Sequence, residues 1–73
     1  MKNRITRKEE LSGKFPQGSR IRLLEKIRDP QPIEKGAEGT VRGIDDMGNI
    51  LMRWDDGRSL SLLPDVDVFE VLK

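Results

Sequence analysis

The sequence contains neither cysteine nor histidine, and only three of its 73 residues are aromatic: Phe15, Trp54 and Phe69. Without thiols and imidazoles, disulfide frameworks, thiol nucleophiles, histidine acid–base relays and zinc sites built from these ligands are excluded. No run of about 18 apolar residues occurs, so we expect no membrane-spanning helix. The polar first residues lack the apolar centre of a secretory signal peptide. We therefore expect a cytoplasmic protein.

The chain is rich in charged residues: 37% of its residues are charged and 34% are hydrophobic. A single domain of this length rarely gains more than about 3–5 kcal/mol of net stability from its core. Residues 1–28 hold nine basic and three acidic side chains, a net charge of +6, whereas residues 29–73 hold five basic and ten acidic ones, a net charge of −5. This asymmetry favours either a basic arm that binds nucleic acid or two faces that attract each other, within one chain or between copies.

Residues 1–14 form a basic N-terminal arm, either flexible or a short helix. Thr6 and Glu9 have the spacing of a capping box, in which the Thr side chain accepts from the backbone and the Glu side chain reaches back. A helix of about two turns is too short to be stable alone in water. We therefore expect it to form only if Ile5 and Leu11 dock on the rest of the chain.

Residues 15–73 show the alternation of polar and apolar residues that is typical of half-buried strands, interrupted by turn signals. Five strands are predicted, at residues 19–25, 39–45, 49–54, 59–62 and 68–72. Gly43 interrupts the period between Val41 and Ile44 and indicates a bulge. The Asp56-Gly57 dipeptide predicts a type I′ hairpin turn, and residues 63–67 predict one helical turn.

The predicted fold class is all-β: a small, SH3-like, five-stranded antiparallel barrel. An OB-fold is less favoured, because the short link at Gly57 leaves no room for its helix. Trp54 is expected in or beside the core, its indole N–H bonded to a loop carbonyl, and Ile33 is expected to pack under its own loop. The remaining core is predicted to consist of Ile21, Leu23, Val41, Ile44, Ile50, Met52, Leu60, Leu62, Val66, Phe69 and Val71.

The chain resembles an uncharacterised bacterial family, a domain of unknown function. The resemblance is carried by residues 15–72, in the motifs Pro16-x-Gly18-x-Arg20-x-x-Leu23, Asp29-Pro30, Gly36-x-x-Gly39-Thr40-Val41, Asp45-Asp46-x-Gly48, Trp54-Asp55-x-Gly57, Ser59-Leu60 and Pro64-x-Val66-Asp67-x-Phe69. It implies an SH3-like barrel and an origin in Gram-positive bacteria, their conjugative elements and phages. It implies no activity, ligand or catalytic residue. Asp56 departs from the Asn expected before the hairpin glycine, and both residues suit that turn.

Two clusters invite chemical interpretations that the residues do not sustain. Asp45, Asp46, Asp55 and Asp56 could supply oxygen ligands to a divalent cation, but they lack the ligand alternation and distal Glu of a calcium loop; turn formation is favoured instead. The segment around Gly39 lacks the Lys-Ser/Thr and the helix of a phosphate-binding loop. We predict no enzyme, no cofactor and no metal site.

The leading hypothesis is a protein-binding adapter, with partner contacts predicted at Ile33, Trp54 and Arg58. The alternative is an accessory nucleic-acid-binding protein whose basic side chains neutralise phosphates. The residues predicted for this role are Lys2, Arg4, Arg7, Lys8, Lys14, Arg20 and Arg22. We expect no membrane contact, and a monomer or a weak homodimer formed by charge pairing between the arm and the body.

Overall fold

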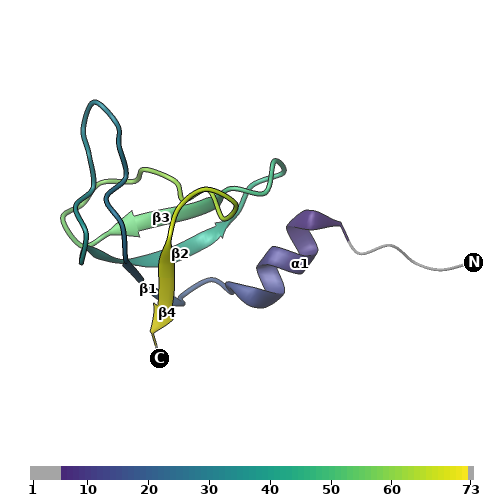
Figure 1. Cartoon of the computed structure of the whole chain (residues 1–73). Coiled ribbons are helices and arrows are strands. Elements are labelled where there is room, and N and C mark those ends of the chain that lie inside the picture. Colours follow the sequence, from purple (N-terminus) through teal and green to yellow (C-terminus); the bar gives the residue numbers. More distant parts are fainter. Residues whose placement is uncertain (1–5, 73) are drawn as a thin grey trace, which may run out of the picture.

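The computed structural model describes residues 6–72 (Figure 1). One helix, α1 (Arg7–Lys14), precedes four strands: β1 (Arg20–Leu23), β2 (Glu38–Ile44), β3 (Ile50–Trp54) and β4 (Phe69–Leu72). The strands form one antiparallel sheet in the order β3-β2-β1-β4. The mostly β fold predicted from the alternation of residues is therefore confirmed.

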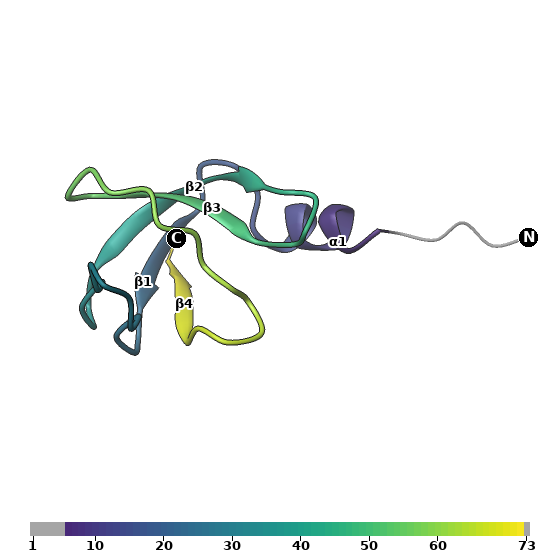
Figure 2. The same ribbon diagram turned by 90° about the horizontal axis from the view of Figure 1, so that it is seen from above.

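The sheet is open, because the segment predicted as a further strand contributes a single bridge. Leu62 pairs with Ile50 through two backbone hydrogen bonds of 2.9 Å, and the rest of residues 59–62 forms no ladder. The carbonyl of Leu60 instead accepts the indole N–H of Trp54 at 2.8 Å. The segment therefore adds no strand to the sheet, and β4 is its last strand on that side (Figure 2).

The predicted type I′ turn at Asp56-Gly57 is wrong. Among the described residues only glycines have positive φ, so Asp56 cannot occupy the left-handed position that a type I′ turn requires. The Gly57 N–H donates to the Trp54 carbonyl at 2.9 Å, and the Trp54 N–H donates to the Arg58 carbonyl at 2.8 Å. These bonds define a three-residue loop that ends in a left-handed glycine, with φ of 95° at Gly57.

The bulge predicted at Gly43 is confirmed. The pairing between β2 and β3 passes from Val41 opposite Met52 directly to Gly43 opposite Leu51. One residue of β2 is therefore unpaired, which restores an inward position for Ile44 although it lies three residues after Val41.

The core fills the inner face of the sheet. Its buried side chains are Leu11, Ile21, Leu23, Ile33, Val41, Ile44, Ile50, Met52, Trp54 and Leu62. Leu60 and Phe69, both predicted as core, are half-buried and pack against it. Two core predictions are wrong: Val66 is 70% exposed and Val71 is 48% exposed. Both lie in the C-terminal segment, where a closed barrel would have covered them and the open sheet does not.

Helix α1 docks on the turn between β2 and β3. The capping box is present, since Thr6 and Glu9 exchange backbone–side-chain hydrogen bonds. Leu11 is buried, with 4% exposure, and its Cδ1 lies 3.4 Å from the position that a Cβ on Gly48 would take. The expected anchor Leu11 is confirmed; Ile5 lies outside the described residues.

Candidate functional site

Two ion pairs join the basic arm to the acidic body of the same chain. Arg7 Nη2 lies 2.7 Å from a carboxylate oxygen of Asp65, and Lys8 Nζ lies 3.0 Å from one of Asp46. All four side chains are about half exposed or more, so these contacts are screened by solvent and orient the helix more than they stabilise it. The charge asymmetry of the sequence is thus expressed, in part, as an intramolecular contact.

A longer chain of ion pairs crosses the outer face of the sheet. Arg20 binds Asp55 through two hydrogen bonds of 2.7 Å and approaches Glu38 at 3.3 Å. Arg22 lies 3.2 Å from both Glu38 and Glu70. Charges of alternating sign therefore run from the turn after β3 across β2 and β1 to β4.

The residues predicted to bind nucleic acid are mostly engaged within the chain. Arg7, Lys8, Arg20 and Arg22 each have an acidic partner. In the last turn of α1, Lys14 has no carboxylate within ion-pair distance among residues 6–72. The remaining two positions, Lys2 and Arg4, lie outside the described residues. The described part of this set therefore presents paired charge rather than a row of available cations.

The Arg20–Asp55 pair predicts a contribution to stability that acid removes. The two hydrogen bonds from Arg20 hold the pKa of the Asp55 carboxyl below its ordinary value of 3.8, and the same bonds raise the pKa of Arg20. A lowered folded-state pKa means that the stabilisation is complete above 3.8 and disappears as pH falls through the folded-state value. We expect Asp55→Asn to reduce the slope of unfolding free energy against pH in that acid range, measured by urea unfolding.

Arg20→Gln provides the matched test, because it removes the cause of the lowered Asp55 pKa from the other side. In the acid range, the unfolding free energy of Arg20→Gln should depend on pH no more strongly than that of Asp55→Asn. An unchanged acid slope in either variant would contradict this assignment.

The residues predicted as partner contacts each take part in holding the fold together. Ile33 is fully buried and forms a backbone bridge with Ile27. Trp54 is 1% exposed and, as expected, donates its indole N–H to a loop carbonyl. The guanidinium of Arg58 donates to the carbonyls of Gln31 and Pro32 at 3.2 and 2.7 Å, which fastens the proline-containing loop. The expectation that Ile33 packs under its own loop is confirmed.

The four aspartates behave as turn residues and ion-pair partners. The Asp45 carboxylate accepts the backbone N–H of Asn49 at 2.8 Å and that of Met47 at 2.9 Å. Hydrogen bonds from Asn49 are the main cause of the lowered pKa of Asp45. Asp56 in turn accepts the guanidinium and the backbone N–H of Arg58, which lower its pKa. Within residues 6–72, no group of three or more carboxylates is placed to hold a metal ion.

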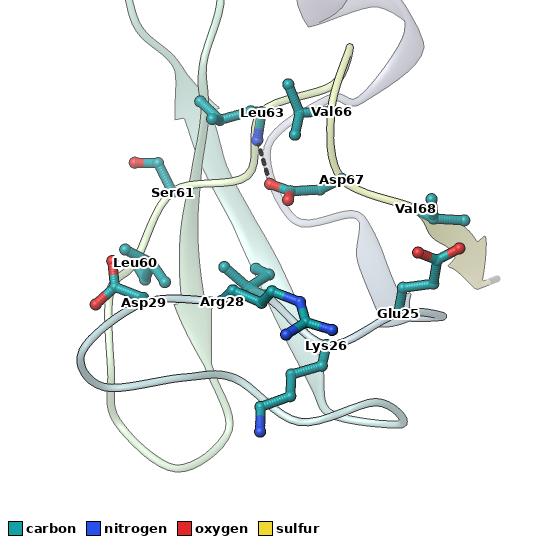
Figure 3. Close-up of a pocket in the computed structure, with 11 residues that line it drawn as sticks. Glu25, Lys26, Arg28, Asp29, Leu60, Ser61, Leu63, Val66, Asp67 and Val68 are labelled. Carbon is teal, nitrogen blue, oxygen red and sulfur yellow. Dashed lines mark hydrogen bonds between the residues drawn. The ribbon is translucent and has the colours of Figure 1, made fainter.

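An open groove of about 500 Å³ lies between the loop after β1 and the segment that leads into β4 (Figure 3). We call it the Val66 groove. It is lined by Glu25, Lys26, Ile27, Arg28, Asp29, Leu60, Ser61, Leu63, Val66, Asp67 and Val68. Three of its apolar side chains are unusually exposed: Leu63 at 43%, Val66 at 70% and Val68 at 41%.

A hydrogen-bonded turn holds these apolar side chains at the surface. The Leu63 N–H donates to the Asp67 carboxylate at 2.8 Å, as Figure 3 shows, and the Leu63 carbonyl accepts from the N–H groups of Val66 and Asp67. The single helical turn predicted for residues 63–67 is therefore confirmed. The other wall is tied to the same segment, because the N–H groups of Leu24 and Glu25 both donate to the Val68 carbonyl. The groove is thus built from fixed backbone.

This groove was not predicted from the sequence, because Val66 was expected in the core. One signal was present: residues 63–68 hold three aliphatic side chains beside a proline and two aspartates, in a segment too short and too polar to be an inner strand. A turn of this kind cannot bury all of its apolar residues.

The described residues define a small, mostly β domain with one docked helix, an ion-paired outer face and an open apolar groove. The chain belongs to the family described as "Domain of unknown function (DUF4314)", whose model matches residues 4–72. The match begins earlier than residue 15, where the resemblance was expected to start, so the family region includes α1 as well as the sheet. Searches of the curated proteins and of the solved structures find no match. In the described part of the chain, no helix has the length and apolarity to cross a membrane.

Proposed function

We propose that this protein is a non-catalytic interaction module that binds an apolar segment of a protein partner in the Val66 groove. The observation that supports this most is the exposure of Val66, at 70%, on a turn whose backbone is fixed by hydrogen bonds. A domain with so small a core gains little by leaving aliphatic side chains in water, since each buried square ångström of apolar surface stabilises by about 25 cal/mol. A partner that covers the groove would recover that free energy.

The surroundings of the groove resemble an interaction surface in composition. Its apolar centre is rimmed by the charged side chains of Glu25, Lys26 and Arg28 (Figure 3). An apolar centre with a polar rim is the usual arrangement of protein interfaces. The groove is open to solvent, which leaves its apolar side chains accessible to a partner segment.

The proposal also covers the fold of the domain and the biological setting of the protein. We regard the open sheet, with its single Ile50–Leu62 bridge, as an SH3-like barrel in which one strand is reduced to a bridge. The bacterial and mobile-element setting implied by the family resemblance is retained as part of the proposal. Nucleic-acid binding stays a prediction of the sequence, and the ion pairing of Arg7, Lys8 and Arg22 lends it no support.

Selection of peptides from a displayed random library on the folded, full-length protein tests this function. We expect the selected peptides to shift the amide resonances of residues 25–29 and 60–68. Val66→Lys should weaken binding by about tenfold or more, because it places a charge where an apolar contact of about 1.5 kcal/mol is made. Met47→Lys is the matched control, since Met47 is 86% exposed and does not line the groove.

A library that yields no peptide, or peptides whose shifts lie outside the groove, would overturn the proposed function. Equal loss of binding in Val66→Lys and Met47→Lys would do the same, because added positive charge rather than groove contact would then be the cause.

A further inference from the structure

The backbone of β4 presents hydrogen-bonding groups that point away from the sheet. Leu23 bonds toward β2, since its N–H donates to the Ala37 carbonyl and its carbonyl accepts from the Gly36 N–H, both at 2.8 Å. Successive residues of a strand bond to opposite neighbours. Arg22, which lies opposite Glu70, therefore bonds toward β4.

The same alternation continues along β4. The backbone N–H and C=O groups of Glu70 and Leu72 face β1. The carbonyl of Val68 does so too, since it accepts from the Leu24 N–H at 2.8 Å. The N–H and C=O groups of Phe69 and Val71 consequently point to the open side. Within residues 6–72 no further strand pairs with that side.

This edge has few of the features that normally prevent strands from pairing with other chains. Natural edge strands are protected by proline, lysine, a bulge or a covering element. The described strand, Phe69–Leu72, contains neither proline nor lysine, and its pairing with β1 is regular. Its inward side chain Val71 is 48% exposed at the same edge. Figure 2 shows the segment that leads into β4 on that side of the strand, but within residues 6–72 it forms no ladder with β4.

We propose that an extended segment of a protein partner adds to β4 as an antiparallel strand. This binding mode rests on the proposed function and specifies how the partner is bound. Val68 lines the groove and immediately precedes Phe69. One segment can therefore pair with the edge and continue into the Val66 groove. Backbone hydrogen bonds provide affinity in this mode of recognition, and alternate side chains provide specificity.

The side chains of the edge define the chemistry of the partner. Side chains of the added strand that lie on the inner face would pack beside Phe69 and Val71, so they should be aliphatic. Those on the outer face would lie beside the carboxylate of Glu70, which is 44% exposed at the end of the ion-pair chain. Since opposite charges on neighbouring strands attract, the partner segment should alternate aliphatic with basic residues.

A second copy of the chain fits this edge less well. A symmetric antiparallel pair of β4 strands that uses the free groups of both Phe69 and Val71 must place its twofold axis at Glu70. The two Glu70 carboxylates would then lie directly opposite each other, and like charges in that position are destabilising. A separate partner with basic residues avoids this repulsion.

The test uses a capped synthetic peptide in which lysine and valine alternate, titrated into the full-length labelled protein and followed by NMR. We expect shifts at β4 and β1, and about tenfold weaker binding by Val71→Pro, which removes an outward N–H and places a ring at the edge. This proline leaves the bonds to β1 intact, because those bonds come from Glu70 and Leu72. The matched control, Val71→Thr, keeps both the N–H and the branched shape, and should bind like the wild type.

Modified peptides keep the proposal testable if Val71→Pro does not fold. N-methylation of the valines should abolish binding to the wild-type protein, because in an antiparallel pair their N–H groups face β4. N-methylation of the lysines should leave binding unchanged, and replacement of lysine by glutamate should weaken it. The opposite pattern, absence of peptide binding, or a peptide-independent dimer would each overturn strand addition. Library peptides that occupy the groove but bind Val71→Pro normally would overturn strand addition while leaving the proposed function intact.

Discussion

Val41→Asp should unfold the protein, whereas Val71→Asp should leave it folded, although the pattern of the sequence assigns both valines to the core. Val41 is 1% exposed at the centre of the sheet, opposite Met52. A carboxylate there would be buried with no basic partner, at a cost of several kcal/mol. A domain of this size has only about 3–5 kcal/mol of net stability to lose.

Val71 lies on the same inner face but at the open edge, with 48% of its surface exposed. A carboxylate at this position reaches water, so the cost should be about 1 kcal/mol, the loss of a β-branched side chain in a strand. Amide spectra and urea unfolding of the two variants measure the contrast. If Val71→Asp also unfolded, β4 would be covered in solution, and both the open sheet and strand addition would be wrong.

The strands were predictable because their alternation is local. Ile21 and Leu23 in β1 lie two positions apart, as do Ile50 and Met52 in β3, and each pair is buried as the period requires. The bulge at Gly43 was predictable for the same reason, since a break in the period has few explanations within a strand.

The incomplete closure of the sheet was not predictable, because it depends on tertiary contacts that spacing does not reveal. The Leu60 carbonyl accepts the indole N–H of Trp54, and within residues 59–62 only Leu62 pairs with a strand. The alternation of these residues is the same for a full ladder and for one bridge, so it could not show that Val66 and Val71 are left uncovered. Those are the two core predictions that failed.

The candidate site was predictable to a smaller extent than the fold. Trp54 was predicted as a partner contact, and aromatic residues are rare in this composition. Rarity does not distinguish a binding residue from a structural one, and Trp54 is buried. The basic residues were recognisable, but their partners are distant in sequence: Arg7 pairs with Asp65, and Arg22 with Glu70. A groove formed by two segments with 30 residues between them, 25–29 and 60–68, leaves little trace in either segment alone.

Gly39→Ala should strongly destabilise the protein, by about 1–3 kcal/mol, which is the usual cost of overpacking a well-packed core. A Cβ at this position would stand 2.9 Å from the Arg53 carbonyl oxygen, 3.0 Å from the Trp54 Cα and 3.0 Å from the Met52 Cε. Two of these atoms belong to the backbone of β3 and cannot rotate away. The φ of Gly39 is not positive, so what requires glycine here is the close approach of β2 to β3.

Gly13→Ala is the matched control, because the same methyl group is added in helix α1, where nothing lies within 4 Å of the new Cβ. Alanine is favoured over glycine in helices by about 0.5–1 kcal/mol, so this variant should be slightly more stable than the wild type. Since each kcal/mol shifts the midpoint of a domain of this size by about 4–8 °C, thermal unfolding should move the two variants in opposite directions. A Gly39→Ala midpoint equal to that of the wild type would show that β2 and β3 are farther apart than the structure places them, and the packing of Met52 and Trp54 beneath them would have to be revised.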